Sequence, residues 1–161
     1  MRVFNSIIVP VDFHQHTDDI ADFAMDVAAK MGAKVTFLHV LEKVIYYSDY
    51  TPSLEQLDDE IVAHAEKKMH FLVKRYMSSG CEGLVLKGDV ADSIVEYVKE
   101  KEPDLLIMGT HGAKGIEKVM LGSVADRVIK RATCPVLTFN PYRGEHGYTI
   151  TSSIGELITP A

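Results

Sequence analysis

The sequence predicts an α/β fold in which one parallel β-sheet carries helices on both faces. Residues 6–11 form a continuous apolar run rather than an alternating one, which is typical of a parallel strand buried on both sides. Residues 105–108 form another short apolar run, and segments with apolar residues at helical spacing separate such runs. Since strands that alternate with helices through right-handed crossovers form a parallel sheet, we expect an open sheet of five strands.

Five short runs are the expected strands, at residues 6–11, 35–41, 83–88, 104–109 and 136–139. In the second run His39 is expected to face away from Leu38 and Val40, because side chains alternate along a strand. Pro135 opens the last run.

Four segments with helical periodicity lie between these strands. The first has Thr17 and Asp18 as cap residues, and Gly32 ends it. The second starts near Leu54, and Gly80 ends it. The expected buried face of this second helix consists of Leu57, Ile61, Val62, Ala65, Met69, Leu72, Val73 and Tyr76.

The third and fourth helices flank the last two strands. Asp89 is expected to cap the third helix, and Pro103 breaks it. The fourth helix follows Ser123, and its basic residues lie near its carboxyl end, where positive charge is favourable. The residues expected to face inward are Val124, Val128 and Ile129, and those expected to face outward are Arg127, Lys130 and Arg131.

The composition fits one folded unit. The chain has 161 residues, 47% of them apolar, and a formal net charge of −6, which argues against a nucleic-acid surface. We expect a domain at residues 1–143 and a C-terminal extension at residues 144–161. The amino terminus leads into a strand pattern without a signal segment, and no apolar run has the length of a membrane span. We therefore expect a cytoplasmic protein without a membrane partner.

A loop with three glycines follows the fourth strand. Gly109, Gly112 and Gly122 lack a Cβ where a backbone can approach a ligand closely or adopt positive φ, and Ser123 can cap the next helix. A helix start with free amides attracts phosphate. The spacing Gly-x2-Gly-x9-Gly-Ser differs from the P-loop and from the dinucleotide fingerprint. The alternative is that these glycines only end a strand and turn the chain.

The glycine loop and four further segments resemble the universal stress protein family, specifically its ATP-binding branch. The resembling segments, besides the loop itself, are residues 7–12, 35–40, 88–95 and 124–137. The resemblance implies strand order 3-2-1-4-5, in which the first and fourth strands are neighbours whose crossovers leave in opposite directions. Such a switch point places a crevice between Asp12 and the glycine loop.

The resemblance also implies a set of contacts to an adenine nucleotide. Asp12 is expected near the ribose, and Val40 is expected to contact adenine through its main chain. The alternatives are that Asp12 caps the following turn and that Val40 is a plain core residue. The full expected set is Pro10, Val11, Asp12, Val40, Met108, Gly109, His111, Gly112, Gly122, Ser123 and Val124.

The leading functional hypothesis is an ATP-binding regulatory protein that acts as a switch or sensor in a stress response. The amides of Gly112, Gly122 and Ser123 would bind the triphosphate of ATP or the phosphates of another adenine nucleotide, and Mg²⁺ would bridge the phosphates. A third reading is a nucleotide-free adaptor, and the intact loop counts against it.

The second hypothesis is an enzyme, either a slow ATPase or a phosphate-transferring protein. Asp12 or His111 would position water, and Lys114 or Lys118 would offset developing charge. The sequence shows no committed catalytic set.

Two pairs of residues could suggest a metal or a disulfide. His14 and His16 have a chelating spacing but no companion ligands, so we expect solvated loop residues. Cys81 and Cys134 are far apart in the sequence and are expected to be free thiols. We therefore expect no metal site formed by side chains.

The last strand and the tail suggest a homodimer. Residues 136–139 are expected at a sheet edge, and the resemblance implies a dimer across that edge. A weak extended pattern covers residues 148–153, and the tail is expected to run onto the partner subunit, where Ile154, Leu157 and Ile158 would pack. The alternative is a tail that folds back on its own subunit.

Overall fold

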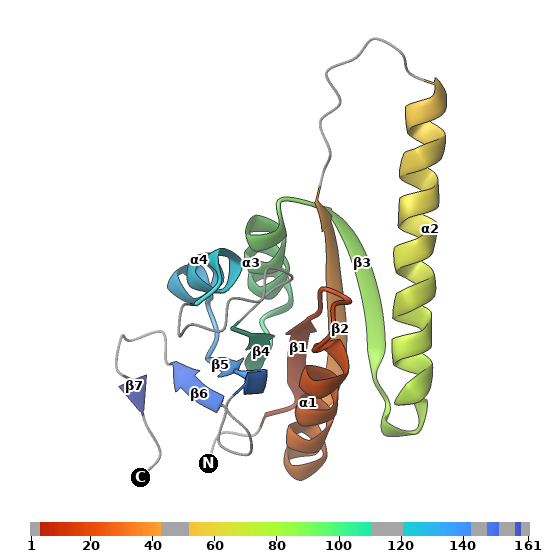
Figure 1. Cartoon of the computed structure of the whole chain (residues 1–161). Coiled ribbons are helices and arrows are strands. Elements are labelled where there is room, and N and C mark those ends of the chain that lie inside the picture. Colours follow the sequence, from red (N-terminus) through yellow and green to blue (C-terminus); the bar gives the residue numbers. More distant parts are fainter. Residues whose placement is uncertain (1–3, 43–51, 111–120, 143–147, 152–156, 159–161) are drawn as a thin grey trace.

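The computed structural model describes residues 4–42, 52–110, 121–142, 148–151 and 157–158, with side chains for residues 4–42, 57–110 and 121–142 (Figure 1). Of the residues expected to bind nucleotide, His111 and Gly112 lie outside the described ranges. The same holds for Lys114, Lys118 and Ile154.

Helices and strands alternate along the chain as expected. The strands are β1 (Ser6–Pro10), β2 (Lys34–Glu42), β3 (Glu82–Gly88), β4 (Leu105–Gly109), β5 (Val136–Phe139), β6 (Tyr148–Thr151) and β7 (Leu157–Ile158). The helices are α1 (Thr17–Met31), α2 (Pro52–Arg75), α3 (Val90–Lys101) and α4 (Ser123–Arg131), and a 3₁₀ turn at Met77–Ser79 follows α2. None of the helices in the described ranges is long and apolar enough to cross a lipid bilayer.

The sheet order is β3-β2-β1-β4-β5-β6-β7. The first five strands are parallel in the order 3-2-1-4-5, which confirms the expected fold class. Strand β1 lies at the centre, where Ile7 pairs with Val35 on one side and with Leu105 on the other. After β1 the chain adds β2 and β3 on one side of it and then returns to add β4 and β5 on the other side. The switch point of the sheet therefore lies between β1 and β4.

Strand β5 is not a sheet edge, and that expectation was wrong for the single chain. Strand β6 pairs with β5 in antiparallel register, with Val136 opposite Thr151 and Phe139 opposite Tyr148, and β7 pairs with β6. The tail thus folds back on its own subunit. A short connection keeps the tail at high effective concentration beside the unpaired side of β5, which favours intrachain pairing. The homodimer itself stays a prediction.

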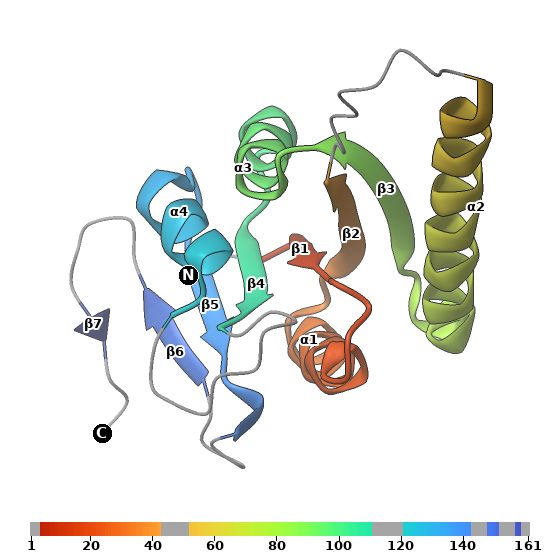
Figure 2. The ribbon, with the colours of Figure 1, turned by 45° about the horizontal axis from the view of Figure 1, so that its top comes forward.

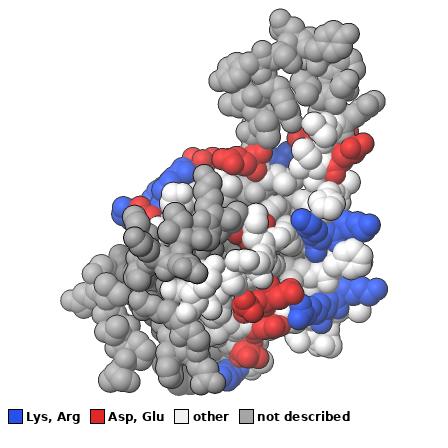
Figure 3. All heavy atoms as spheres, in the orientation of Figure 1, with Lys and Arg blue, Asp and Glu red and all other residues white. Residues whose placement is uncertain are grey.

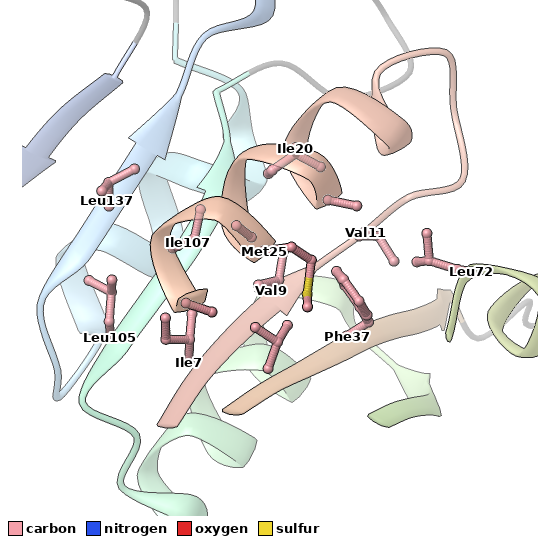
Figure 4. Close-up of a cluster of buried hydrophobic side chains, with 14 of the residues drawn as sticks. Ile7, Val9, Val11, Ile20, Met25, Phe37, Leu72, Leu105, Ile107 and Leu137 are labelled. Atoms are coloured by element: carbon pink, nitrogen blue, oxygen red, sulfur yellow. The ribbon is translucent and has the colours of Figure 1, made fainter. Parts of the chain in front are cut away.

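Helices α1 and α2 cover one face of the sheet, and α3 and α4 cover the other (Figure 2). Ile7, Val9 and Phe37 are buried beneath α1 and α2 (Figure 4). Ile8 and Leu38 are buried on the opposite face, beneath α3 and α4. Because neighbouring residues of one strand enter opposite cores, both cores need apolar residues, and the strand reads as a continuous apolar run.

Gly32 and Asp89 cap their helices as predicted, whereas Gly122, not Ser123, is the N-cap of α4, and Gly80 ends the 3₁₀ turn after α2. Gly32 adopts a left-handed conformation with φ of 69° and ends α1. The Asp89 side chain accepts a hydrogen bond from the amide of Asp92 and caps α3. At the start of α1, His16 occupies the cap position without a side-chain cap, and Thr17 is the first helical residue. The prediction of Thr17 or Asp18 as the cap was therefore wrong.

Helix α2 buries only part of the expected face. Ala65, Met69 and Leu72 are buried against the sheet, whereas Leu57 and Ile61 are 44% and 38% exposed. Figure 1 shows that the amino-terminal part of α2 rises beyond the carboxyl ends of β2 and β3. The apolar spacing of α2 continues into turns that lie beyond the edge of the sheet and have no sheet to pack on. The expected burial of Leu57 and Ile61 was therefore wrong.

Candidate functional site

The two strand ends that define the switch point are those of β1 and β4. Ile8 pairs with Leu106, so Pro10 and Met108 lie each two residues further on, at the carboxyl edge of the sheet. From β1 the chain turns toward α1 on one face, and from β4 it turns toward α4 on the other. The structure thus brings Pro10, Asp12, Met108 and Gly109 to the same edge, where open α/β sheets bind ligands.

Asp12 holds the turn that follows β1. One carboxylate oxygen accepts hydrogen bonds from the His14 amide at 3.0 Å and from the Thr17 hydroxyl at 3.4 Å. The other oxygen lies 3.4 Å from Nδ1 of His14. The turn-capping alternative is therefore present in the structure. The side chain is nevertheless 44% exposed, and two carboxylate oxygens can accept about four hydrogen bonds, so Asp12 retains acceptor capacity toward a ligand.

Val11 is fully engaged with the protein. Its amide donates to the Leu38 carbonyl at 2.8 Å, its carbonyl accepts from Nδ1 of His39 at 2.8 Å, and its side chain is buried beneath α1. Val11 can therefore shape the wall of a site but has little left to offer a ligand directly.

The main chain of Val40 points past the end of β1. The pairing of β1 with β2 ends at Pro10 and Leu38. Residues two apart in a strand present their N–H and C=O groups to the same side, so Val40 presents its main chain in the direction in which Leu38 accepts from Val11. The Val40 side chain is buried on the α3 and α4 face. Val40 is thus a core residue by its side chain and a possible ligand contact by its main chain.

The ends of the glycine loop are tied together and to β5. The Thr110 amide donates to the Phe139 carbonyl at 2.9 Å, and the Gly122 amide donates to the Thr110 carbonyl at 2.8 Å. The Gly122 amide thus already has a main-chain partner in this structure, and its expected contact with phosphate stays a prediction. Gly122 has φ of −60° and ψ of 151°, an extended conformation that any residue can adopt.

Helix α4 starts directly after Gly122, and its amino terminus lies at the carboxyl edge of the sheet. The first helical hydrogen bond runs from the Asp126 amide to the Gly122 carbonyl at 2.9 Å. The amides of Ser123, Val124 and Ala125 precede that bond and have no carbonyl partner within the helix. These amides, rather than that of Gly122, form the anion-attracting end of α4.

A cluster of ion pairs holds α4 against α3. The Arg127 guanidinium donates to both Asp89 carboxylate oxygens, at 3.1 and 3.0 Å, and to Asp92 at 3.0 Å. Arg131 also donates to Asp92. The Arg127 guanidinium, and then the Asp92 amide, hold the pKa of Asp89 below its usual range. This cluster was not recognised in the sequence, where the basic residues read only as an outward face.

Two residues beside the site, Phe13 and His39, were not expected from the sequence to contribute to it. His39 lies 4.5 Å from Phe13, measured between ring centroids, and Phe13 has φ of 58°, which is uncommon for a residue other than glycine. Burial lowers the pKa of His39, and the bond to the Val11 carbonyl opposes that shift. The available signal was a histidine within an otherwise apolar strand.

A hollow of about 400 Å³ opens between the end of β2 and helix α2. It is lined by Asp12, Phe13, His39, Leu41, Leu57, Glu60, Ile61, His64, Ala65 and Lys68. Of the described residues that are expected to bind nucleotide, only Asp12 lines this hollow. It therefore lies on the α2 side of the switch point, next to the expected crevice.

The histidines of the first loop lie beside carboxylates and stay partly exposed to solvent, His14 at 55% and His16 at 31%. Nδ1 of His16 lies 2.9 Å from Asp19, and its ring packs edge-on against Tyr142 at 4.9 Å. Among the described residues, no group of three or more His, Cys, Asp or Glu side chains could hold a metal ion. Neither Cys81 nor Cys134 forms a disulfide bond, as expected.

These features define a doubly wound α/β protein whose switch point lies between β1 and β4. The chain belongs to the universal stress protein family, which it matches over residues 4–140. It is 30% identical over 139 residues to a universal stress protein of Methanocaldococcus jannaschii, which covers 84% of this chain and 82% of that protein. A solved structure of universal stress protein UspA from Lactobacillus plantarum has a TM-score of 0.77 at 25% identity, covering 86% of this chain and 99% of that one.

Two further solved structures of the family were determined with nucleotides. One, in complex with cAMP, has a TM-score of 0.62 at 23% identity and covers 86% of this chain and 98% of that one. Another, from Archaeoglobus fulgidus in complex with dAMP, has a TM-score of 0.59 at 22% identity, with 85% and 98% covered. At these identities the similarity shows the fold.

Proposed function

We propose that this chain binds an adenine nucleotide, with ATP and Mg²⁺ as the leading choice, and acts as a nucleotide-dependent regulatory protein in a stress response. The observation that carries the proposal is the main chain of Val40, which faces the space beyond the end of β1. Asp12 stands at one side of that space. The first amides of α4 belong to the opposite crossover.

The Val40 main chain suits adenine by its hydrogen-bonding pattern. The adenine edge offers an amino donor at N6 beside an acceptor at N1. A peptide C=O and N–H that point the same way match this pair, whereas guanine presents an acceptor and a donor in the reverse order. Recognition through Val40 therefore favours adenine over guanine.

The sugar and the phosphates have partners along the same edge. The exposed part of the Asp12 carboxylate can accept from ribose hydroxyl groups. The amides of Ser123 and Val124 can donate to phosphate oxygens at the start of α4. Contacts from His111 and Gly112 remain part of the proposal, as does a Mg²⁺ ion held mainly by the phosphates.

The ligands of related proteins support the chemical class. The family structures with cAMP and with dAMP contain adenine nucleotides that differ in their sugar and phosphate. Adenine is the feature these two ligands share, which agrees with recognition through a main-chain edge. The number of phosphates must be determined by binding measurements.

Calorimetric titration of the full chain with ATP, ADP, AMP, cAMP and GTP, each with and without Mg²⁺, tests the proposal. We expect ATP to bind at least about tenfold more tightly than GTP, because one mismatched pair of hydrogen bonds corresponds to about 1.4 kcal/mol or more. Absence of binding by every adenine nucleotide would overturn the proposal. Equal affinity for ATP and GTP would remove the role of Val40.

A slow ATPase remains the second candidate. One observation favours it: the imidazole of His14 lies beside the Asp12 carboxylate at 3.4 Å, at the end of the crevice, where the pair could position water. Phosphate release measured with wild-type protein and with Asp12→Asn distinguishes the two functions. Turnover at several per second that falls in the variant supports an enzyme, and its absence supports a switch.

A homodimer through β5 is also proposed, from the family resemblance. Strand β6 occupies the outer side of β5 in the single chain. Such a dimer therefore requires β6 to leave β5 or to be exchanged between subunits.

A further inference from the structure

The hollow of about 400 Å³ between the end of β2 and helix α2 has no role in the proposed nucleotide contacts apart from Asp12. Its volume lies within the range of roughly 300–1,000 Å³ in which proteins bind small molecules. Leu57 and Ile61 of α2 and Leu41 of β2 give it an apolar wall. The hollow therefore has the size and the kind of lining that a small-molecule site requires.

One end of the hollow is built around the ring of Phe13. His39 lies 4.5 Å from this ring, measured between centroids, and Nζ of Lys68 lies 5.8 Å from its centroid. Phe13 has φ of 58°, and a bulky residue keeps such a conformation only where the surrounding structure imposes it. Because strain of this kind concentrates at ligand sites, it supports a binding role for this end. We call Asp12, Phe13, His39 and Lys68 the charged end of the hollow.

The charged end holds opposite charges that do not pair with each other. Within the described ranges, Asp12 has His14 as its ion-pair partner, and Lys68 contacts the Phe13 ring but no carboxylate. Besides burial, which lowers the pKa of His39, Asp12 raises that pKa and Lys68 lowers it, so both charges lie near the imidazole. A carboxylate and an ammonium group that line one space without contact can each bind a ligand group of the opposite sign.

His39 adds a hydrogen-bond acceptor to the charged end. Its Nδ1 donates to the Val11 carbonyl at 2.8 Å, so in the neutral ring Nε2 carries no proton and accepts. The described residues give Nε2 no hydrogen-bond partner. Together with the exposed part of the Asp12 carboxylate, this nitrogen suits the donors of an ammonium group.

We propose that the hollow binds a free α-amino acid with an apolar side chain. The α-ammonium group donates to Asp12 and to Nε2 of His39, and the α-carboxylate accepts from Lys68. The side chain of the ligand packs against Ile61 and Leu57. Lys68 and Ile61 are seven residues apart, which is two turns or about 10 Å along α2. A side chain such as that of leucine or phenylalanine therefore extends from the charged end toward the apolar wall.

The charges of the hollow favour a zwitterion over other small molecules. Glu60 lies in the first part of α2 and Lys68 in its second part, and Figure 3 shows acidic side chains over the upper part of this helix and basic ones over its lower part. An anion would meet the carboxylates of Asp12 and Glu60, and a simple amine would leave Lys68 unpaired. A ligand that covers these groups replaces the water around them, so it must offer one charge of each sign.

Calorimetric titration of the full chain with L-leucine and L-phenylalanine, without nucleotide, tests the proposal. We expect a dissociation constant below about 1 mM for at least one of them. Leucinamide lacks the carboxylate, N-acetyl-leucine lacks the ammonium group, and serine lacks the apolar side chain, so each should bind at least about tenfold more weakly than the better of these two amino acids. Absence of binding by both amino acids at about 10 mM would overturn the proposal. Equal affinity for leucine and leucinamide would contradict recognition of a zwitterion.

Lys68→Gln tests the contact with the carboxylate, and Lys67→Gln is its matched control. Lys67 is the neighbouring exposed lysine of α2 and does not line the hollow. Lys68→Gln should weaken the binding of leucine by about tenfold and keep the weaker binding of leucinamide within about twofold, since only leucine offers Lys68 a carboxylate. Lys67→Gln should change neither. Equal losses of leucine affinity in the two variants would contradict the assigned contact.

Ile61→Ser tests the apolar wall, with Phe71→Ser as its control. Both residues are exposed on α2, at 38% and 58%, and of the two only Ile61 lines the hollow. Ile61→Ser should weaken the binding of leucine several-fold, and Phe71→Ser should not. Unchanged leucine affinity in Ile61→Ser would overturn the placement of the side chain. These titrations contain no nucleotide, and these variants change no residue proposed to bind it, so the proposed function and this inference can fail separately.

Discussion

Arg127 of α4 binds Asp89 of α3 through two parallel hydrogen bonds, NH1 to Oδ2 at 3.1 Å and NH2 to Oδ1 at 3.0 Å. The same Asp89 carboxylate accepts from the Asp92 amide at 2.9 Å and so caps α3. One side chain therefore fixes the start of α3 and binds α4 one turn after the amides of Ser123 and Val124. Bidentate pairs of this kind restrain orientation as well as distance.

Asp89→Asn separates these two roles. Asparagine remains a good cap, so α3 should keep its start, whereas the charge toward Arg127 is lost. We expect a lower melting temperature at pH 7. Because the folded pKa of Asp89 is lowered, its contribution is present above the usual carboxyl pKa and is lost as pH falls through the folded value. The difference between variant and wild type should therefore shrink between pH 7 and pH 3.

Asp126→Asn is the matched control for that measurement. Asp126 pairs with Lys130 at 2.8 Å within α4 itself, one turn along the helix, and that pair links α4 to no other element. Exposed pairs of this type contribute little to stability. Equal losses of melting temperature in Asp126→Asn and Asp89→Asn would show that the link between α3 and α4 has no special role.

Gly122→Val should abolish nucleotide binding and leave the fold intact. The backbone at Gly122 is extended, so valine fits its conformation, and the main-chain bond to Thr110 can persist. The branched side chain would instead occupy space beside the first amides of α4. Calorimetry should show no ATP binding, and denaturation should show a change in stability within about 0.5 kcal/mol. Unchanged ATP affinity would place the phosphates elsewhere, and an unfolded variant would make Gly122 structural.

His39 should make the stability of the protein depend on pH near neutrality. Burial lowers the pKa of His39, so folding favours the neutral form of its imidazole, whose Nδ1 donates to the Val11 carbonyl. A histidine with a lowered pKa contributes stability that is present above the unfolded pKa of about 6.5 and decreases as pH falls below it. Wild-type protein should therefore lose stability between pH 7.5 and pH 5.

His39→Asn provides the comparison, because the asparagine amide can still donate to Val11 but does not titrate. Urea denaturation at several pH values should give a flatter profile for this variant over the same interval. If the two profiles are parallel, the acid sensitivity comes from groups other than His39.

The strands could be predicted because they depend on local patterns, whereas the expected sheet order came from the family resemblance. Ile7 and Ile8 enter different cores, and a strand that feeds two cores must be apolar at every position. The exposure of Leu57 could not be predicted, since helical periodicity does not reveal where the sheet beneath the helix ends. The hydrogen bond between the Gly122 amide and the Thr110 carbonyl joins two main-chain groups and has no side-chain signature.

Truncation after Tyr142 tests the role of the tail. In the single chain β6 covers the outer side of β5, so its removal should expose four residues of strand as a template for pairing. We expect the truncated chain to dimerise more tightly than the full chain through Val136–Phe139. The opposite result, weaker dimerisation, would mean that the tail contributes to the interface between subunits. The measurement is sedimentation equilibrium of the full chain and of the truncated chain, each over the same range of protein concentration.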